Sequence, residues 1–291
     1  VGAGIFLTDE PMSRHTTFRT GGPADIYIEP SGVEELKQVL DICREENVAY
    51  TIIGNGSNLL VGDGGYRGVL ISFGKPFAQV TIEGAQVRTG AGALLSAVAK
   101  QVLNASLTGF EFAAGIPGTI GGAVVMNAGA YGGELCQVLR EATVLTPEGE
   151  VKTLPAEELE LGYRTSCVQK NGYIVLEAVL QLQPGNADDI RAVMDALASK
   201  RREKQPLEYP SAGSTFKRPE GHFAGRLIQD AGLRGFRVGG AQVSEKHCGF
   251  VINRDHATSA DILSLCRQVQ EKVKAQFGVE LELEVKLLGE F

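Results

Sequence analysis

The sequence predicts a mixed α/β fold built from more than one domain, and three observations support this. The chain has 291 residues, which exceeds the ~100–200 residues of one average domain. Strand-like and helix-like apolar patterns alternate along the chain. Glycine is in excess, with 37 of the 291 residues, roughly 13% against an average of ~7%. No repeating period accompanies the glycines, so they are expected to serve tight turns and close backbone approach to other groups.

The first part, residues 1–75, combines strand signals with one helix signal. Residues 24–28 and 69–72 are apolar and predict strands, and residues 50–53 predict a short buried strand that ends in a glycine loop. Ser31 and Glu34 have the spacing of a capping box at the start of a helix. The apolar residues that share one face of this helix are Leu36, Val39, Leu40 and Cys43. The order of elements favours a βαβ-like unit.

The second part, residues 76–186, changes to β-hairpins. The segment 80–89 predicts a hairpin that turns at Glu83-Gly84, and residues 142–154 predict a second hairpin. Residues 94–103 predict a helix and residues 173–182 a long strand, whereas residues 109–133 are almost all small.

The third part, residues 187–291, begins with a helix that Asn186 opens and Pro206 ends. Its apolar face consists of Ile190, Val193, Met194 and Leu197. A loop-rich region and a strand at 249–253 follow, and then a helix capped by Ser259 that ends at Gly278. This helix is expected to bury Ile262, Leu265, Cys266, Val269 and Val273. The final segment, 281–287, alternates strictly and predicts a strand.

Composition excludes several classes of protein. A net charge of 28 − 35 = −7 argues against a general binder of nucleic acid or acidic membranes. No apolar run approaches the ~20 residues that span a bilayer, and the N-terminus lacks the basic region of a signal peptide. The five cysteines are odd in number and contain no C-x-x-C pair. We therefore expect a cytoplasmic protein with reduced thiols and neither disulfides nor a metal site.

Two glycine segments are candidate cofactor sites. The first, Gly54-Asn55-Gly56-Ser57-Asn58, follows the strand at 50–53, and its backbone N–H groups and polar side chains could converge on an anion. An ordinary strand-to-strand turn is the alternative. The second lies within 115–134, where packed helices or strands are not expected because each glycine costs ~0.5–1 kcal/mol of ordering. Its candidate residues are Gly115, Pro117, Gly118, Gly121, Gly122, Asn127, Ala128 and Gly129.

Two glycine loops in one α/β region suggest a dinucleotide that contains a diphosphate. The usual fingerprints are nevertheless absent. Gly90-Ala91-Gly92 begins like G-x-G-x-x-G, but Leu95 stands at the third glycine. The chain also contains no Walker A, H-E-x-x-H or G-x-S-x-G motif.

Scattered polar residues form a third set of candidates. They are Tyr163 and Arg164 in YRTS, Ser214, Lys217 and Arg218 in SAGSTFKRP, Arg226, His247, and Glu284. Between residues 211 and 248 six Lys or Arg stand against three acids, and this positive balance suits an anionic substrate. Each residue also has an ordinary explanation, as a turn serine, a paired surface arginine or an outward-facing strand glutamate.

Together these segments resemble the UDP-N-acetylenolpyruvoylglucosamine reductases, also called UDP-N-acetylmuramate dehydrogenases. The resemblance extends from HTTFRTGGPAD through GNGSNLL, GIPGTIGGAVVMNAGAYG, YRTS, SAGSTFKRP and AGRLIQDAGLRG to LELEVKLLG. The glycine segments also occur in FAD-binding proteins of the p-cresol methylhydroxylase/vanillyl-alcohol oxidase type. YRTS, AGSTFKRP and the C-terminal glutamate are more specific to the reductases.

The resemblance implies two FAD-binding subdomains, residues 1–75 and 76–186, and a C-terminal α+β substrate domain, residues 187–291, whose last strand returns Glu284 to the active site. FAD would be bound without a covalent link, and NADPH would be the co-substrate. The implied reaction takes hydride from NADPH to flavin N5 and then to UDP-N-acetylglucosamine enolpyruvate. The product, UDP-N-acetylmuramate, is a precursor for peptidoglycan and hence for the cell wall.

The resemblance also implies roles for individual residues. Ser214 matches the family's proton donor, and Arg164 and Glu284 match the two other catalytic positions. This agrees with the chemistry, because hydride addition to an enolpyruvyl ether builds an enolate that needs stabilising groups and a proton. The implied substrate contacts are Tyr163, Lys217, Arg218, Arg226 and His247. With no room between YRTS and SAGS for the tyrosine-bearing loop of some members, the chain resembles the shorter subtype. Arg218, Arg226 and His247 would then contact the diphosphate or the uridine.

Two other functions are alternatives to the reductase. One is an FAD-dependent oxidase or dehydrogenase that acts on an alcohol or hydroxy acid. Many of these attach flavin through His or Cys, and the GNGSN loop contains neither. The other is a nucleotide-binding protein without catalysis, which the presence of Arg164, Ser214 and Glu284 disfavours.

Overall fold

A computed structural model describes residues 4–291, so the first three residues of the predicted first part lie outside it. The described chain packs into two compact units. Unit 1 comprises residues 4–6, 27–55 and 70–200, and unit 2 comprises residues 7–26, 56–69 and 201–291. Both units combine helices with sheets, which confirms the predicted mixed α/β fold.

The main sheet of unit 1 has the strand order β12-β11-β13-β7-β6, with every neighbouring pair antiparallel. Its strands are β6 (Val80–Glu83), β7 (Gln86–Gly90), β11 (Leu139–Leu145), β12 (Val151–Pro155) and β13 (Ile174–Gln181). Both predicted hairpins are confirmed: β6 pairs with β7, and β11 pairs with β12. The central strand β13 is almost wholly buried, as its long apolar run predicts.

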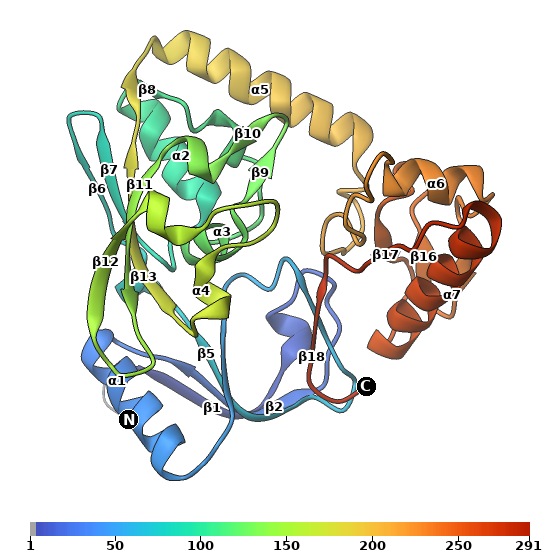
Figure 1. Cartoon of the computed structure of the whole chain (residues 1–291), viewed down its shortest axis with the longest axis horizontal. Helices are drawn as coiled ribbons and strands as arrows, with labels where there is room; N and C mark the ends of the chain where they lie inside the picture. Colours follow the sequence, from blue (N-terminus) through green and yellow to red (C-terminus); the bar gives the residue numbers. More distant parts are fainter. Residues whose placement is uncertain (1–3) are drawn as a thin grey trace. The chain divides into compact units, whose positions relative to one another are not determined.

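Helices α2 (Leu95–Asn104), α3 (Ile120–Met126) and α4 (Cys167–Lys170) share an apolar core with this sheet in unit 1 (Figure 1). The unit also contains α1 (Val33–Glu45) and the first part of α5 (Ala187–Lys204). Helices α2 and α3 contribute Val98, Val102 and Val124 to the same apolar core as Val175 and Leu180 of β13. The short strand pairs β8 (Leu107–Thr108) with β14 (Gln183–Pro184), and β9 (Gly129–Ala130) with β10 (Gly133–Glu134), complete the unit.

A second sheet has the strand order β1-β2-β5-β3. Its strands are β1 (Ile5–Pro11), β2 (Pro23–Glu29), β5 (Tyr66–Ser72) and β3 (Tyr50–Ile53). The predicted order of strand, helix and strand is confirmed by β2, α1 and β3, although β5 lies between the two strands in the sheet. The prediction of a buried strand at 50–53 was only half right, because Tyr50 is exposed and Ile53 is buried.

Three helix predictions need correction. Gly32, not Ser31, is the N-cap of α1, so the third helical residue is Glu35; its carboxylate accepts hydrogen bonds from the N–H and Oγ of Ser31. Thr258, not Ser259, caps α7, and Thr258 forms a capping box with Asp261. The apolar face of α5 is only partly covered: Ile190 is buried and Met194 packs against the core, but Val193 is 48% exposed.

Unit 2 is built around two small sheets and two helices. Strand β4 (Leu59–Val61) pairs in parallel with β18 (Lys286–Leu288), and a three-stranded sheet has the order β15-β16-β17. The remaining elements are β15 (Arg237–Val238), β16 (Ala241–Val243), β17 (Val251–Asn253), α6 (Ala224–Asp230) and α7 (Ser259–Phe277). Helix α7 packs on the three-stranded sheet (Figure 1). It buries the predicted residues and ends at Gly278, whose φ of 71° is left-handed.

The predicted strand at 281–287 was too long, because the regular strand covers only Lys286–Leu288. The segment before it is extended, but its alternation breaks where Glu284 and Val285 are both buried. Tertiary hydrogen bonds override the two-residue pattern here: Lys217 N–H donates to Glu282 O, and Glu284 N–H donates to Thr215 O. Glu284 is therefore buried and does not face solvent.

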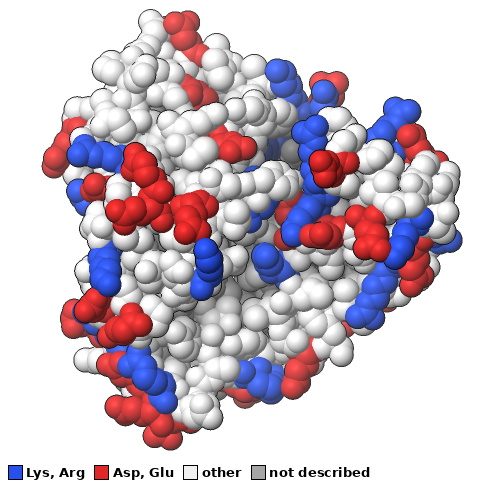
Figure 2. Space-filling view, viewed as in Figure 1, with Lys and Arg blue, Asp and Glu red and all other residues white. Residues whose placement is uncertain are grey.

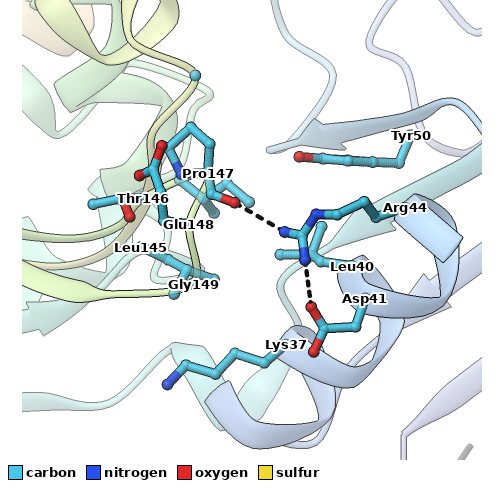
Figure 3. Close-up of a pocket in the computed structure, with 12 residues that line it drawn as sticks. Lys37, Leu40, Asp41, Arg44, Tyr50, Leu145, Thr146, Pro147, Glu148 and Gly149 are labelled. Carbon is cyan, nitrogen blue, oxygen red and sulfur yellow. Dashed lines mark hydrogen bonds and ion pairs between the residues drawn. The ribbon is translucent and has the colours of Figure 1, made fainter.

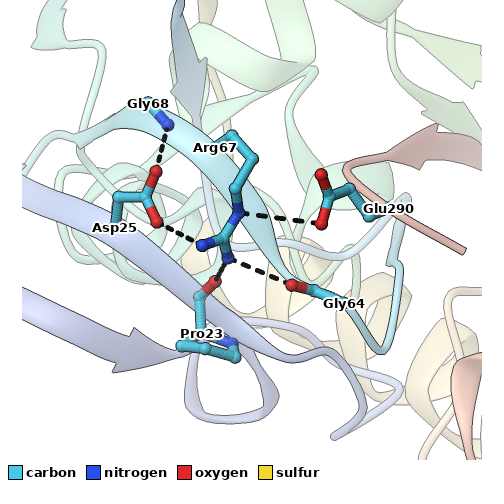
Figure 4. A network of polar contacts seen from close by, with 6 residues as sticks. All are labelled: Pro23, Asp25, Gly64, Arg67, Gly68 and Glu290. Atoms are coloured by element: carbon cyan, nitrogen blue, oxygen red, sulfur yellow. Dashed lines mark hydrogen bonds and ion pairs between the residues drawn. The ribbon is translucent and has the colours of Figure 1, made fainter.

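Arg67 of β5 connects separate segments of unit 2 (Figure 4). Its guanidinium lies 2.5 Å from Asp25 Oδ1 and donates to the carbonyl oxygens of Pro23 and Gly64 at 3.0 Å. Its Nε lies 3.8 Å from a Glu290 carboxylate oxygen near the end of the chain. The network therefore ties β2 and the C-terminal segment to β5. Because its ion pairs are largely exposed, we expect each to contribute only about 0–1 kcal/mol.

Candidate active site

Unit 1 brings the two predicted glycine segments together. The side-chain amide of Asn55 donates to Pro117 O at 2.8 Å. A Cβ placed on Gly54 would lie 2.7 Å from Thr119 Oγ1, so only glycine allows this close approach. Thr119 also caps α3, because its Oγ1 accepts a hydrogen bond from Gly122 N–H at 3.3 Å. Residues 54–55 and 117–119 therefore form one continuous surface.

Backbone donors in these segments suit an anionic ligand. Within residues 4–291, no hydrogen-bond partner is found for the backbone N–H groups of Asn55, Ser57 and Gly118. Asn55 is exposed and Ser57 and Gly118 are half-buried, so these N–H groups are accessible to a ligand or to solvent. Successive amides in a glycine loop form a concavity that binds anions such as a diphosphate. The donors and the bare backbone beside them fit the diphosphate of a dinucleotide such as FAD.

Close packing explains other glycines in the second segment. Gly121 lies in the first turn of α3, where its N–H donates to Ala91 O at 2.8 Å and an added Cβ would meet Ala91 Cβ at 3.0 Å. An added Cβ on Gly129 would lie 2.7 Å from Glu134 Cγ. The expectation that no helix fits this stretch was therefore wrong, because α3 uses glycine to approach its neighbour. Cofactor contacts at Gly121, Gly122 and Gly129 stay predictions.

Asn127 organises the loop that follows α3. The residue is 2% exposed and has a left-handed φ of 41°. Its amide Nδ2 donates to Glu134 Oε2 at 3.1 Å and to Gly162 O at 3.2 Å, and its Oδ1 accepts from Cys136 N–H at 2.9 Å. These protein contacts give Asn127 a structural role in addition to its predicted role in cofactor binding. Cofactor contacts of Ala128, which follows Asn127, and of Gly115 also stay predictions.

Arg164 belongs to unit 1 and lies beside the predicted cofactor segment. Its Nη2 donates to Gly129 O at 3.3 Å. The residue sits in a tight turn in which Gly162 and Thr165 exchange backbone hydrogen bonds, and its φ of 56° is left-handed. Such a conformation is uncommon for a residue other than glycine. The guanidinium lies 5.5 Å from the ring centroid of Tyr163, which is exposed.

In unit 2, the segment that contains Ser214 pairs through its backbone with the segment that contains Glu284. Glu284 N–H donates to Thr215 O at 2.9 Å, and Lys217 N–H donates to Glu282 O at 2.8 Å. The segments 214–217 and 282–285 therefore run side by side, although they are far apart in sequence. Ser214 is exposed, whereas Glu284 is only 8% exposed. The two residues thus lie on paired segments, and the exposed Ser214 hydroxyl is accessible to a substrate that needs a proton.

Asn58 contacts the segment that carries Glu284. Its side-chain amide donates to Glu284 O at 3.1 Å, and its backbone carbonyl accepts from Lys286 N–H at 2.9 Å. Gly56, in the same loop, lies against the backbone of His15, where an added Cβ would be 2.0 Å from the carbonyl oxygen. Packing within unit 2 thus explains part of the GNGSN motif, and contacts of these residues with a cofactor stay predictions.

The predicted cationic substrate residues all lie in unit 2 and differ in their surroundings. Lys217 Nζ lies 2.7 Å from Glu282 Oε2, and Arg226 Nε lies 2.8 Å from Asp230 Oδ2. Through its hydrogen bond, Lys217 lowers the pKa of Glu282. The guanidinium of Arg218 lies over the exposed ring of Phe223, 4.1 Å from its centroid. The aromatic ring of Phe223 therefore contacts the guanidinium of Arg218.

His247 is held as a neutral ring. Its Nδ1 accepts a hydrogen bond from Gly249 N–H at 3.1 Å, and its ring meets the Phe250 ring edge-on at 5.0 Å. Burial lowers the pKa of His247, because desolvation disfavours the charged form. The acceptor role of Nδ1 leaves the ring proton on Nε2. His247 therefore offers a substrate a neutral N–H donor and not a positive charge.

Sequence reasoning missed Thr215, which connects these residues. Thr215 is 1% exposed, its N–H donates to Gly249 O at 2.9 Å, and its Oγ1 accepts from Val251 N–H at 2.9 Å. A threonine beside a serine in a loop gives no pattern signal. Only the tertiary contacts distinguish it.

A separate hollow lies between α1 and the β11–β12 turn in unit 1 (Figure 3). Its volume is about 190 Å³, and Arg44 bridges it by pairing with Asp41 at 2.8 Å and donating to Pro147 O at 2.9 Å. None of the predicted site residues lines it. Its one arginine is already held by Asp41 and Pro147, so the hollow gives no indication of a ligand.

Neither the surface charge nor the metal-binding residue types indicate a further site in the described part of the chain. Acidic and basic side chains are interspersed over much of the face in Figure 2. Among the described residues, no group of three or more His, Cys, Asp or Glu could hold a metal ion. No helix in the described part of the chain is long and apolar enough to cross a membrane.

Comparisons with known proteins agree with this geometry. Residues 24–155 match the family model described as "FAD binding domain", and residues 205–288 match "UDP-N-acetylenolpyruvoylglucosamine reductase, C-terminal domain". A relative from Agathobacter rectalis named UDP-N-acetylenolpyruvoylglucosamine reductase is 56% identical over 98% of this chain and 94% of its own length. A relative of the same name from Clostridium perfringens is 56% identical over 97% of this chain and 92% of its own.

A solved structure gives the same result at lower identity. The crystal structure of UDP-N-acetylenolpyruvylglucosamine reductase from Thermus caldophilus matches with a TM-score of 0.84 and 36% identity, over 98% of each chain. The match to the relatives and to this structure covers both units, including the segments of Arg164, Ser214 and Glu284. The chain therefore belongs to the UDP-N-acetylenolpyruvoylglucosamine reductase family.

Proposed function

We propose that this chain reduces UDP-N-acetylglucosamine enolpyruvate to UDP-N-acetylmuramate, with FAD as a non-covalent cofactor and NADPH as the reductant. The family assignment supports the reaction. The observation in the structure that supports it best is the backbone pairing of the segment that carries exposed Ser214 with the segment that carries buried Glu284. An oxidase of the same fold group is not favoured, because relatives that share more than half of their residues with this chain are named as reductases.

The residues that would hold FAD are those of the two glycine segments. Asn55, Ser57 and Gly118 offer backbone N–H groups, and Gly54 and Pro117 lie beside them. When bound, FAD supplies two-electron chemistry, accepting hydride from NADPH and delivering it to the substrate. Neither His nor Cys lies in the GNGSN loop, so we infer that the cofactor dissociates intact.

The remaining chemistry belongs to side chains of the protein. Hydride is added to the methylene carbon of the enolpyruvyl group, and negative charge then develops at the adjacent carbon and its carboxylate. Arg164 stabilises this charge. The Oγ–H bond of Ser214 breaks as a C–H bond forms at the carbon next to the carboxylate, and the serine regains a proton from solvent. Glu284 shares a proton with the substrate carboxylate and thereby helps to stabilise the enolate.

Substrate binding falls to Tyr163, Lys217, Arg218, Arg226 and His247. Arg218 and Arg226 contact the diphosphate, because their guanidinium groups are exposed and can donate in pairs. His247 contributes its neutral Nε2–H to a polar atom of the nucleotide or sugar. The exposed Tyr163 borders the same substrate, beside Arg164.

We also propose the three-part organisation with boundaries at 75/76 and 186/187. In this organisation the first two parts hold FAD, and the third binds the substrate. A cytoplasmic location follows from the supply of NADPH and nucleotide sugars in that compartment.

Anaerobic titration tests the function. NADPH should bleach the flavin absorbance with one equivalent, and the enolpyruvyl sugar nucleotide should restore it. In D₂O, one deuterium should enter the carbon next to the carboxylate of the product. UDP-N-acetylglucosamine, which lacks the enolpyruvyl group, is the matched control and should leave the flavin reduced. Failure of the enolpyruvyl compound to reoxidise the flavin would rule out the reaction.

A further inference from the structure

We propose that Thr215 is a positioning residue for the proton transfer, and that its side chain keeps Ser214 in register with Glu284. The inference rests on the proposed function, because it assigns a role within the same site. Thr215 touches neither the substrate nor the cofactor in this proposal. It acts through the backbone of the two residues beside it in space.

Three segments of unit 2 meet at Thr215. Its N–H donates to Gly249 O at 2.9 Å, and its carbonyl oxygen accepts from Glu284 N–H at 2.9 Å. Its Oγ1 accepts from Val251 N–H at 2.9 Å. All three polar groups of the residue are thus used, two toward the segment 249–251 and one toward Glu284. Since Ser214 precedes Thr215 directly, these bonds fix the backbone from which the Ser214 hydroxyl projects.

The side chain is the part of this junction that a substitution can remove. Thr215 is 1% exposed and Val251 is likewise buried, so water cannot readily replace the Oγ1 acceptor. Valine has the shape of threonine without the oxygen, and it would leave Val251 N–H without a partner. A buried donor that loses its only acceptor tends to move until it finds another. The 249–251 segment would shift, and Gly249 O would shift with it, away from Thr215 N–H.

Such a shift would affect one half of the reaction only. Proton transfer depends steeply on the distance between donor and acceptor, and displacements of about 1 Å can cost 10²-fold. Flavin reduction by NADPH requires no proton from Ser214 and no contact with Glu284. Reoxidation by the enolpyruvyl substrate requires both. A purely structural role for Thr215 would instead lower FAD content or both half-reactions together.

His247 extends the same junction from the other side. Its Nδ1 accepts from Gly249 N–H, while Gly249 O accepts from Thr215 N–H. Gly249 itself must be glycine, because an added Cβ would lie 2.9 Å from His247 Cε1. The hydrogen bonds therefore form a continuous path from His247 through Gly249 and Thr215 to Glu284.

Three variants of the FAD-loaded full chain test the inference. In Thr215→Val, reoxidation should slow by about 10- to 100-fold, while flavin reduction and FAD content stay near the parent values. Thr215→Ser restores the hydroxyl and should recover most of the lost rate. Thr146→Val is the matched control, because Thr146 is 4% exposed and its Oγ1 likewise accepts a backbone N–H, that of Glu150 at 3.3 Å. It should leave the ratio of the two half-reactions unchanged.

The outcomes separate the inference from the proposed function. A parent protein that NADPH reduces but the enolpyruvyl substrate cannot reoxidise overturns both. A working parent with a Thr215→Val variant that reoxidises normally, or that slows equally in both half-reactions, overturns the inference alone. If Thr215→Val does not load FAD, Thr215→Ala, which removes both γ atoms, takes its place with the same expected ratio. Failure of both variants to load FAD would make Thr215 a residue of folding and overturn its positioning role.

Discussion

The side-chain amide of Asn58 donates a hydrogen bond to the backbone carbonyl of Glu284, with Nδ2 and O 3.1 Å apart. The same peptide segment is fixed from the other side, since Glu284 N–H donates to Thr215 O. Glu284 is thus anchored at both of its backbone polar groups, which leaves only its side chain to adjust. A motif that the sequence assigned to cofactor binding therefore also holds a proposed catalytic residue in place.

Replacing Asn58 with Ala should separate these two roles. We expect reoxidation by the enolpyruvyl substrate to fall by about 10-fold, the typical effect of losing one hydrogen bond of ~1.4 kcal/mol, while FAD affinity changes less. Stopped-flow absorbance and FAD titration measure the two effects. A large loss of FAD affinity with normal reoxidation would show that Asn58 is a cofactor ligand instead.

Ser214→Ala should slow only the half-reaction that protonates carbon. Loss of a positioned general acid typically costs ~10²–10⁴-fold, or about 3–5 kcal/mol of barrier. Flavin reduction by NADPH and FAD content should stay near the parent values. Ser214→Cys is the informative companion, because a thiol is the stronger acid and should restore part of the rate. Equal slowing of both half-reactions would assign Ser214 a structural role in the loop.

Arg218→Ala should raise KM more than it lowers kcat, because a diphosphate contact binds the ground and transition states alike. A charge-assisted contact is worth about 1.5–3 kcal/mol, which corresponds to roughly a 10- to 100-fold increase in KM. Arg254→Ala is the matched control, since the Arg254 guanidinium lies 4.3 Å from the ring centroid of Tyr209 in a similar arrangement. Steady-state kinetics that are the same for both variants would place Arg218 on the surface without a substrate role.

His247 predicts a pH dependence of stability. Burial lowers its pKa below the ordinary value of 6.5, so the unfolded chain binds its proton at a higher pH than the folded chain. The contribution of neutral His247 to the free energy of unfolding is therefore fully present above about pH 6.5. It is lost as the pH falls from there toward the pKa of His247 in the folded chain. His247→Asn keeps an acceptor near Gly249 N–H but does not titrate, and its urea-denaturation midpoint should vary less between pH 5 and 7.5. An unchanged pH dependence would mean that other groups cause it.

Gly54→Ala should weaken FAD binding. The added methyl would lie 2.7 Å from Thr119 Oγ1, so the loop or the start of α3 must shift, and the unpaired N–H groups nearby shift with it. We expect a loss of about 10-fold or more in FAD affinity, since one displaced charge-assisted hydrogen bond is worth ~1.5–3 kcal/mol. Gly32→Ala is the control, because Gly32 has open space around it and an extended backbone with a φ of 172°. Equal FAD affinity in both variants would contradict a cofactor site at Gly54.

Local patterns were sufficient for most elements of the fold. The hairpins at β6–β7 and β11–β12, the buried strand β13 and the buried face of α7 follow from apolar periodicity and turn residues, which act between neighbours in sequence. The cap positions were wrong by one residue at Ser31 and Ser259. At each site a neighbouring residue became the N-cap because the backbone turned one position away from the expected one.

The tertiary structure alone decided how the site residues are held. The sequence identified Ser214, Glu284 and the glycine segments, and it also identified the family to which the chain belongs. It could not show that Glu284 is buried, because strict alternation at 281–287 predicts an outward-facing residue. In the folded chain Glu284 N–H donates to Thr215 O and Glu284 O accepts from Asn58, and the side chain is buried. Nor could it show that His247 is neutral or that Thr215 joins three segments. Those properties depend on burial and on hydrogen bonds that form only in the folded chain, such as those of Thr215 with Gly249 and Val251, and no pattern within one segment records them.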